Sequence, residues 1–69
     1  MRLENWFIVT NDFGHKKVAV AYGKVYGNDR FEDGTDIHTS LIMECDEDMK
    51  WIKTMNSVYE LGTPLHGRE

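Results

Sequence analysis

The sequence contains one cysteine, one proline and no long apolar run. A single thiol, Cys45, excludes an internal disulfide and is typical of a reducing compartment, so we expect a cytoplasmic protein. No run approaches the ~18 apolar residues of a membrane span, and Met1–Glu4 lacks the apolar core of a signal peptide. We therefore expect no membrane partner.

Basic residues are also scarce, with eight Lys and Arg against twelve Asp and Glu and a formal net charge of -4. A general nucleic-acid binder needs a basic face to neutralise phosphates, so direct nucleic-acid binding is not expected. Two interpretations of the acidity remain open. Either it keeps the protein soluble, or an acidic face mimics nucleic acid or binds a basic partner.

The chain is short, and its 69 residues, 1–69, predict a single domain. A domain of this size buries only about 60% of its unfolded surface, and small domains commonly need a disulfide, a metal or a partner subunit. With 41% hydrophobic and 29% charged residues, the chain is globular rather than disordered. Because the chain is short and can form no internal disulfide, we predict a homo-oligomer.

Three runs rich in β-branched and aromatic residues predict strands, at residues 6–10, 18–26 and 37–44. Alternation along the second run places Ala19 and Ala21 on a small-residue face that allows close packing. Gly23, inside the same run, predicts a bulge or a sharp bend. The third run is expected to be one continuous strand, and an acidic turn follows it.

Residues 49–61 allow two interpretations. An amphipathic helix fits an N-cap at Asp46 and apolar residues near helical spacing. A hairpin fits strands around Ile52 and Tyr59 with a turn at 55–57, and we favour it because the segment is rich in strand formers. The prediction is thus an all-β fold, a small antiparallel barrel or rolled sheet of about five strands, SH3-like in size. Residues 65–69 are expected to be a frayed tail.

The longest break between apolar runs, residues 27–36, carries an Arg, an aromatic residue, four carboxylates and two glycines. It belongs to the pattern G-x-V-Y-G-x-x-R-F-x-D-G-T-x-I-x-T-S at residues 23–40, which is followed by T-x-N-S-x-Y-x-L-G at residues 54–62. These patterns resemble a group of very short uncharacterised proteins of bacteria, prophages and phages. The resemblance implies a small β domain of phage or mobile-element origin. Small acidic phage proteins are similar in style to counter-defence proteins, which inhibit a host complex or take up a signalling nucleotide.

Arg30 and Phe31 are the leading candidates for ligand binding. A guanidinium can clamp a phosphate or carboxylate while an aromatic face stacks on a base, and long loops on β scaffolds commonly carry such groups. The alternative is that Arg30 pairs with a neighbouring carboxylate and Phe31 plugs the end of the barrel. The candidate ligand-binding residues are Arg30, Phe31, Tyr26, Thr39, Ser40 and Tyr59.

Metal binding and catalysis have little support. An EF-hand frame started at Asp29 places Phe31 and Ser40 where acidic or amide ligands are required. The three histidines have no zinc spacing, and His38 has no identifiable orienting acid or oxyanion donor. We therefore expect no metal, no cofactor and no enzymatic activity.

The leading prediction is a small non-enzymatic protein that binds an anionic or nucleotide-like ligand, or a host protein, through the Arg30–Phe31 loop. The alternative is an acidic protein inhibitor of a host defence complex, for example a nucleic-acid mimic. Its candidate partner-binding residues are Asp29, Glu32, Asp33, Asp46, Glu47 and Asp48. Trp6 and Trp51 are expected to be core or interface anchors.

Overall fold

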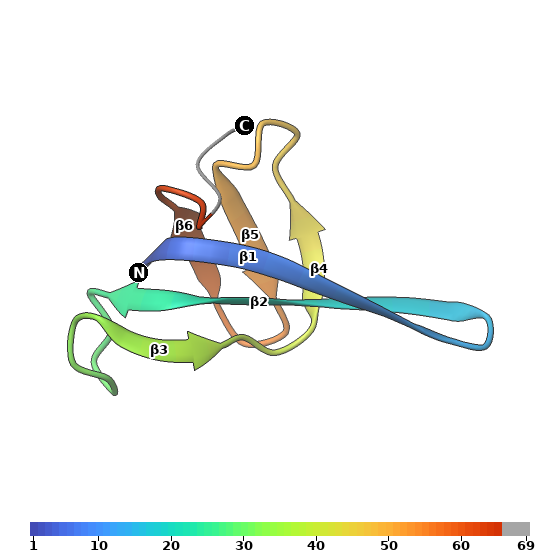
Figure 1. The fold of residues 1–69 in the computed structure, drawn as a ribbon, viewed down its shortest axis with the longest axis horizontal. Coiled ribbons are helices and arrows are strands. Elements are labelled where there is room, and N and C mark those ends of the chain that lie inside the picture. The colour runs from blue at the N-terminus through green and yellow to red at the C-terminus, as the bar shows by residue number, and fades with distance from the viewer. Residues whose placement is uncertain (66–69) are drawn as a thin grey trace.

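The computed structural model describes residues 1–65, which form one six-stranded sheet and no helix. The strands are β1 (Arg2–Phe13), β2 (Lys16–Tyr26), β3 (Thr35–His38), β4 (Ile42–Cys45), β5 (Trp51–Thr54) and β6 (Val58–Leu61). Their order is β3-β2-β1-β6-β5-β4, and only β1 and β6 run parallel. The sheet rolls without closing, so β3 and β4 are its edges (Figure 1). The all-β, rolled-sheet prediction is confirmed, with six strands instead of about five.

The β1–β2 hairpin is the longest element, and a bulge bends it near its base. Asn5 and Trp6 stand opposite Gly23, because the register shifts between Glu4 and Phe7. Asn5 has a φ of 54°, a left-handed conformation that Asn tolerates better than most residues. A Cβ on Gly23 would lie 3.2 Å from the Cα of Trp6, a tight contact with the backbone, so the bulge favours glycine there. The bulge predicted at Gly23 is confirmed.

The core lies between the base of this hairpin and the β5–β6 hairpin. Its buried apolar residues are Leu3, Ala21, Val25, Ile52, Tyr59 and Leu61. Ala21 is fully buried, which confirms that the small-residue face of β2 allows close packing. Trp6 packs against this core and donates from Nε1 to the Gly62 carbonyl oxygen at 3.0 Å, so it acts as a core residue.

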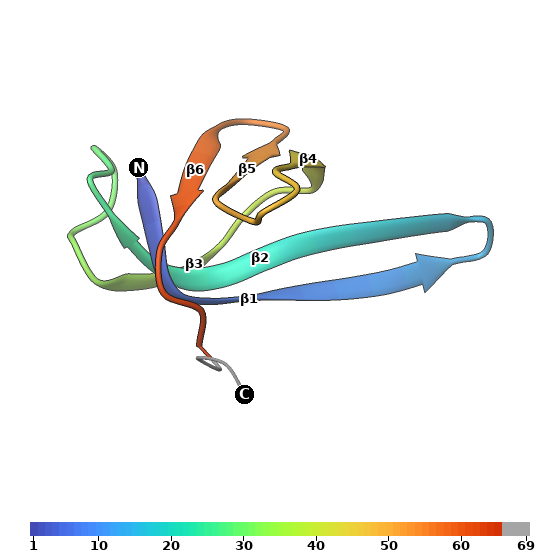
Figure 2. The same ribbon diagram turned by 90° about the horizontal axis from the view of Figure 1, so that it is seen from above.

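The outer half of the β1–β2 hairpin projects away from the rest of the molecule (Figures 1 and 2). β6 pairs with β1 only at Arg2 and Leu3, and β3 pairs with β2 only from Tyr22 to Val25. From Val9 and Val20 outward, the described part of the sheet is a two-stranded ribbon.

The single strand predicted over residues 37–44 is wrong, because the chain leaves the sheet at Thr39. The Thr39 amide donates to the Ala21 carbonyl at 2.8 Å, and the Ala21 amide donates to Thr39 Oγ1 at 3.1 Å. The Thr39 hydroxyl thus accepts the Ala21 amide in place of a backbone carbonyl, and β3 ends here. Residues 39–41 then cross from one edge of the sheet to the other, where β4 begins.

The hairpin predicted within residues 49–61 is confirmed as β5 and β6. Thr54 holds its turn, since the hydroxyl donates to the Ser57 carbonyl at 3.0 Å and accepts from the Ser57 amide at 3.1 Å. The expected tail is wrong at Leu65, whose amide donates to the Trp6 carbonyl at 2.9 Å. The rest of that prediction, residues 66–69, lies outside the described residues.

Candidate functional site

The loop between β2 and β3, residues 27–34, is built by its own polar groups. Asp33 Oδ1 accepts from the Gly27 amide at 3.0 Å, which bridges the two ends of the loop. Asn28 Oδ1 accepts from the Arg30 amide at 2.6 Å, a local bond typical of Asn in turns. Gly27 and Gly34 have φ values of 77° and 88°, where other residues are strained. The sequence therefore specifies the loop conformation locally.

Arg30 is exposed on this loop, and its guanidinium forms no ion pair or hydrogen bond within residues 1–65. Two of the four neighbouring carboxylates are engaged elsewhere. Asp33 binds the Gly27 amide, and Asp36 binds Lys24 Nζ at 3.1 Å. Phe31 is 41% exposed, so it does not plug the sheet. The pairing of Arg30 with a neighbouring acid, one of the two interpretations of the sequence, is absent from the described part of the chain.

A shallow hollow of about 350 Å³ lies beside the loop. Its lining residues are Met1, Arg2, Tyr26, Gly27, Asp33 and Glu60. The Arg2 guanidinium carbon lies 5.0 Å from the centre of the Tyr26 ring, a cation–π contact. The hollow thus combines a cation, an aromatic face and two acidic residues, Asp33 and Glu60, at one end of the loop.

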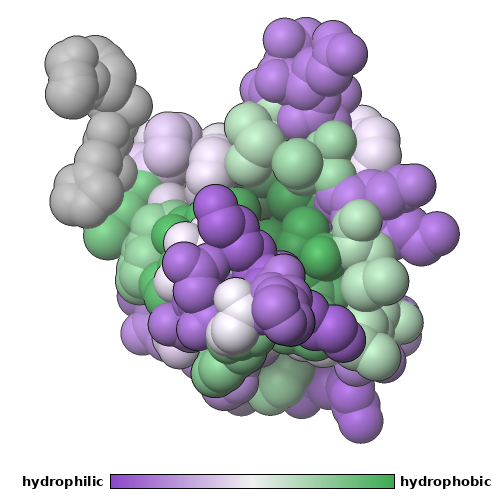
Figure 3. All heavy atoms as spheres, turned by 90° about the vertical axis from the view of Figure 1, so that its right-hand side faces the viewer, coloured by the Kyte–Doolittle hydropathy of each residue, from purple (hydrophilic) through white to green (hydrophobic). Residues whose placement is uncertain are grey.

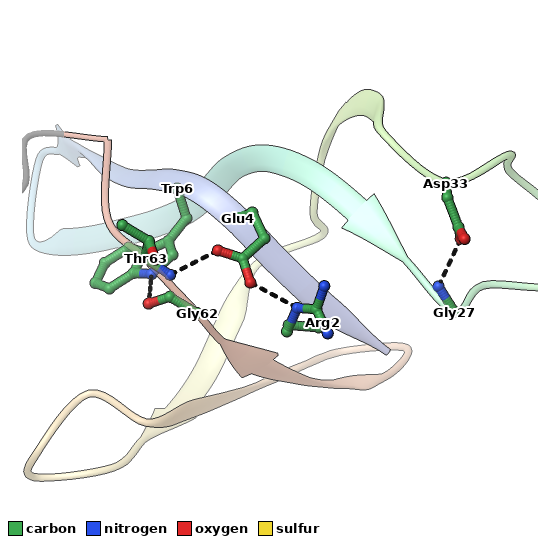
Figure 4. A network of polar contacts seen from close by, with 7 residues as sticks. All are labelled: Arg2, Glu4, Trp6, Gly27, Asp33, Gly62 and Thr63. Atoms are coloured by element: carbon green, nitrogen blue, oxygen red, sulfur yellow. Dashed lines mark hydrogen bonds and ion pairs between the residues drawn. The ribbon is translucent and has the colours of Figure 1, made fainter.

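Arg2 is held in place by Glu4, as Figure 4 shows. Arg2 Nε lies 2.6 Å from Glu4 Oε2, while Glu4 Oε1 accepts from the Thr63 amide at 2.8 Å. The Thr63 hydrogen bond is the main reason that the pKa of Glu4 lies below its usual value, and Arg2 adds to it. The Glu4 side chain is only 26% exposed. Glu4 therefore remains a carboxylate that fixes both the hollow and the end of β6.

Three of the candidate ligand-binding residues lie away from open surface. Thr39 is 3% exposed and Tyr59 is 8% exposed, and both belong to the interior of the sheet. Ser40 is half-buried, and its Oγ is buried with no partner among the described residues. Only Arg30, Phe31 and Tyr26 of the predicted set present side chains around the loop.

The six candidate partner-binding acids fall into two groups. Asp29, Glu32 and Asp33 lie on the loop after β2, whereas residues 46–48 form the turn between β4 and β5. These two segments lie apart in both Figure 1 and Figure 2. The acids therefore do not form one continuous face.

Sequence reasoning missed an aromatic ladder on the outer face of the first three strands. Phe7 and Tyr22 stack with ring centres 5.3 Å apart and planes 5° apart, and His38 lies 5.5 Å beyond Tyr22. All three residues are exposed. The bulge at Asn5 and Trp6 sets the register that brings Phe7 opposite Tyr22. In the sequence, Gly23 indicated a bulge but did not indicate which residues of the two strands pair.

Within residues 1–65 there is no cluster of three or more His, Cys, Asp or Glu side chains arranged to hold a metal ion. The described residues also contain no helix long and apolar enough to cross a membrane. No protein-family model, curated protein or solved structure matches the chain.

Proposed function

We propose that this protein binds a small anionic, nucleotide-like ligand at the loop formed by residues 27–34. Arg30 provides the charge that contacts phosphate, and Phe31 provides a face for the base. Tyr26, at the base of the loop, adds a second aromatic surface. The protein acts by binding, without catalysis.

The observation that carries this proposal is the guanidinium of Arg30, which has no partner among residues 1–65 and stands on a locally braced loop. Within residues 1–65, Arg30 contacts no carboxylate, although Asp29, Glu32 and Asp33 are close in sequence. A planar guanidinium recognises phosphate oxygens bidentately. Because Asp33 and Asn28 hold the backbone, binding requires little ordering of the loop, and a small ordering cost favours affinity.

The resemblance of residues 23–40 and 54–62 to short uncharacterised proteins of bacteria, prophages and phages supports a viral role for such binding. On this proposal the protein acts in the host cytoplasm as a counter-defence protein that takes up a nucleotide. The separation of the two acidic segments disfavours inhibition through one acidic face.

Calorimetric titration with three probes tests the proposal: ADP, pyrophosphate and adenosine. These probes present phosphate with a base, phosphate alone and a base alone. We expect ADP to bind more tightly than either part. Arg30→Ala should weaken ADP and pyrophosphate by about thirtyfold or more, as truncating a charge-assisted contact costs on the order of 2–5 kcal/mol.

The variants Arg30→Lys and Phe31→Leu separate charge from shape. Lysine keeps the charge but loses the fork, so partial binding of pyrophosphate should remain. Phe31→Leu should remove the advantage of ADP over pyrophosphate and leave pyrophosphate unchanged. Lys50→Ala, another exposed cation, is the matched control and should bind as wild type. Failure of all three probes to bind, or unchanged binding by Arg30→Ala, would contradict the proposal.

A further inference from the structure

Among residues 1–65, the projecting part of the β1–β2 hairpin is covered by no second layer. Between Val9↔Val20 and Phe13↔Lys16 its two strands pair, in the described part of the chain, only with each other. A two-stranded hairpin in water is marginally stable at best. Phe13, near its tip, is 65% exposed. A ribbon of this kind gains stability when another surface covers one of its faces.

One face of this hairpin is mostly apolar. Residues paired across the two strands have side chains on the same face, and along each strand the side chains alternate between the two faces. The residues of this face are Phe7, Val9, Asn11, Phe13, Lys16, Val18, Val20 and Tyr22. Six of these eight side chains are apolar or aromatic, and the cation Lys16 stands beside Phe13 at the outer end. We call this set the hairpin face.

A second apolar surface lies on the outside of β4, β5 and β6. Met43 is 62% exposed, Met55 63%, Val58 53% and Trp51 37%. Two shallow hollows of about 490 and 460 Å³ lie here and share Glu44 and Lys53 in their linings. Trp and Met are enriched in the centres of protein interfaces, and exposed apolar patches mark such sites. We call this set the meander face.

The two faces carry opposite charge. The charged residue of the hairpin face is Lys16, while Lys17 and Asp12 lie on the opposite face, so the tip as a whole carries two lysines against one aspartate. The meander face has Glu44 and Glu60 in its lining, and the acidic turn at residues 46–48 adjoins it, against Lys53. Figure 3 looks onto the hairpin tip, where hydrophilic side chains stand in front of apolar surface on the body. Complementary charge of this kind selects the partner and fixes its orientation.

We propose that two copies of this chain form a two-fold dimer in which the hairpin face of each docks on the meander face of the other. Phe13 enters the apolar hollow beside Trp51, and Lys16 contacts Glu44 of the second copy. Two-fold symmetry makes both contacts occur twice. The dimer covers each exposed hairpin and leaves the loop at residues 27–34 free, so the proposal is independent of ligand binding there.

Charge reversal in two separate chains tests this arrangement by sedimentation equilibrium at low micromolar concentration. Lys16→Glu and Glu44→Lys each place like charges at both contacts of their own dimer. Each dissociation constant should rise about tenfold or more, given coupling energies of ~1.5–7 kcal/mol for close interfacial charge pairs. A mixture of the two variants restores opposite charges at both contacts and should give a heterodimer of wild-type affinity. Lys16→Glu/Glu44→Lys in one chain should restore the homodimer.

Asp29→Lys changes the net charge as much as Glu44→Lys but lies on the loop after β2, so it should leave the dimer intact. Phe13→Ser should weaken the dimer while the diluted monomer keeps its circular dichroism spectrum. A monomeric wild type would overturn the proposal. So would single variants that weaken the dimer without rescue in the mixture, since the hairpin would then contact a different surface.

Discussion

The Glu4 carboxylate lies against Gly62, in the space where any other residue would carry its Cβ. From there it accepts the Thr63 amide and binds Arg2. β1 and β6 pair only at Arg2↔Glu60 and Leu3↔Leu61. The carboxylate therefore extends a short parallel contact that joins the first and last strands of the described chain.

The variant Gly62→Ala should destabilise the fold by about 1 kcal/mol. Its methyl group would displace the Glu4 carboxylate and remove the Thr63 hydrogen bond. Alanine also reduces the conformational entropy of the unfolded chain, which offsets part of the lost stability. Chemical denaturation measures the change. Glu4→Ala/Gly62→Ala should cost less than the sum of the two single variants, because both remove the same contact. Additive effects would show that the carboxylate is not what Gly62 accommodates.

Acidification should remove the contribution of Glu4. The pKa of this carboxyl is lowered in the folded protein from its usual 4.5, chiefly by the Thr63 amide. A lowered pKa in the folded state gives stability that is present above the unfolded pKa and is lost as pH falls through the folded pKa. Wild type should therefore be more stable than Glu4→Gln at neutral pH. The difference should shrink below pH 4.5. A difference in melting temperature that stays constant with pH would contradict this.

Gly23→Ala should destabilise the bulge at the base of the long hairpin. The added Cβ would lie 3.1 Å from the Glu4 carbonyl oxygen and 3.2 Å from Trp6 Cα, both backbone atoms that cannot turn aside. Overpacking of this kind typically costs about 1–3 kcal/mol. The resonance of the Trp6 indole N–H should shift as well, since Trp6 donates to the Gly62 carbonyl. Gly14→Asn is the control, with open space around it and a φ of 64° that Asn tolerates.

The sequence predicted what depends on local chemistry. Strand-forming residues with turn signals gave the β fold, and Gly23 gave the bulge. What it did not predict depends on contacts distant in sequence. Thr39 ends β3 only because Ala21 lies beside it, and nothing local distinguishes that threonine from one inside a strand. The same limit applies to the candidate site. Arg30 stood out by its loop, whereas the burial of Tyr59 follows from packing against residues far along the chain.

Thr39→Val should lower stability by about 1–3 kcal/mol, because a side chain of the same shape without a hydroxyl leaves the Ala21 amide unpaired in the interior. Thr39→Ser keeps the hydroxyl and loses one buried methyl group, so its cost should be smaller, about 1 kcal/mol. Thermal denaturation followed by circular dichroism gives both values. The pair also separates the structural role of Thr39 from the ligand-binding role suggested by the sequence. If Thr39→Val melts as wild type but no longer binds ADP, the hydroxyl contacts the ligand. If it loses stability while Thr39→Ser binds ADP normally, Thr39 ends β3 and supports the site only through the fold.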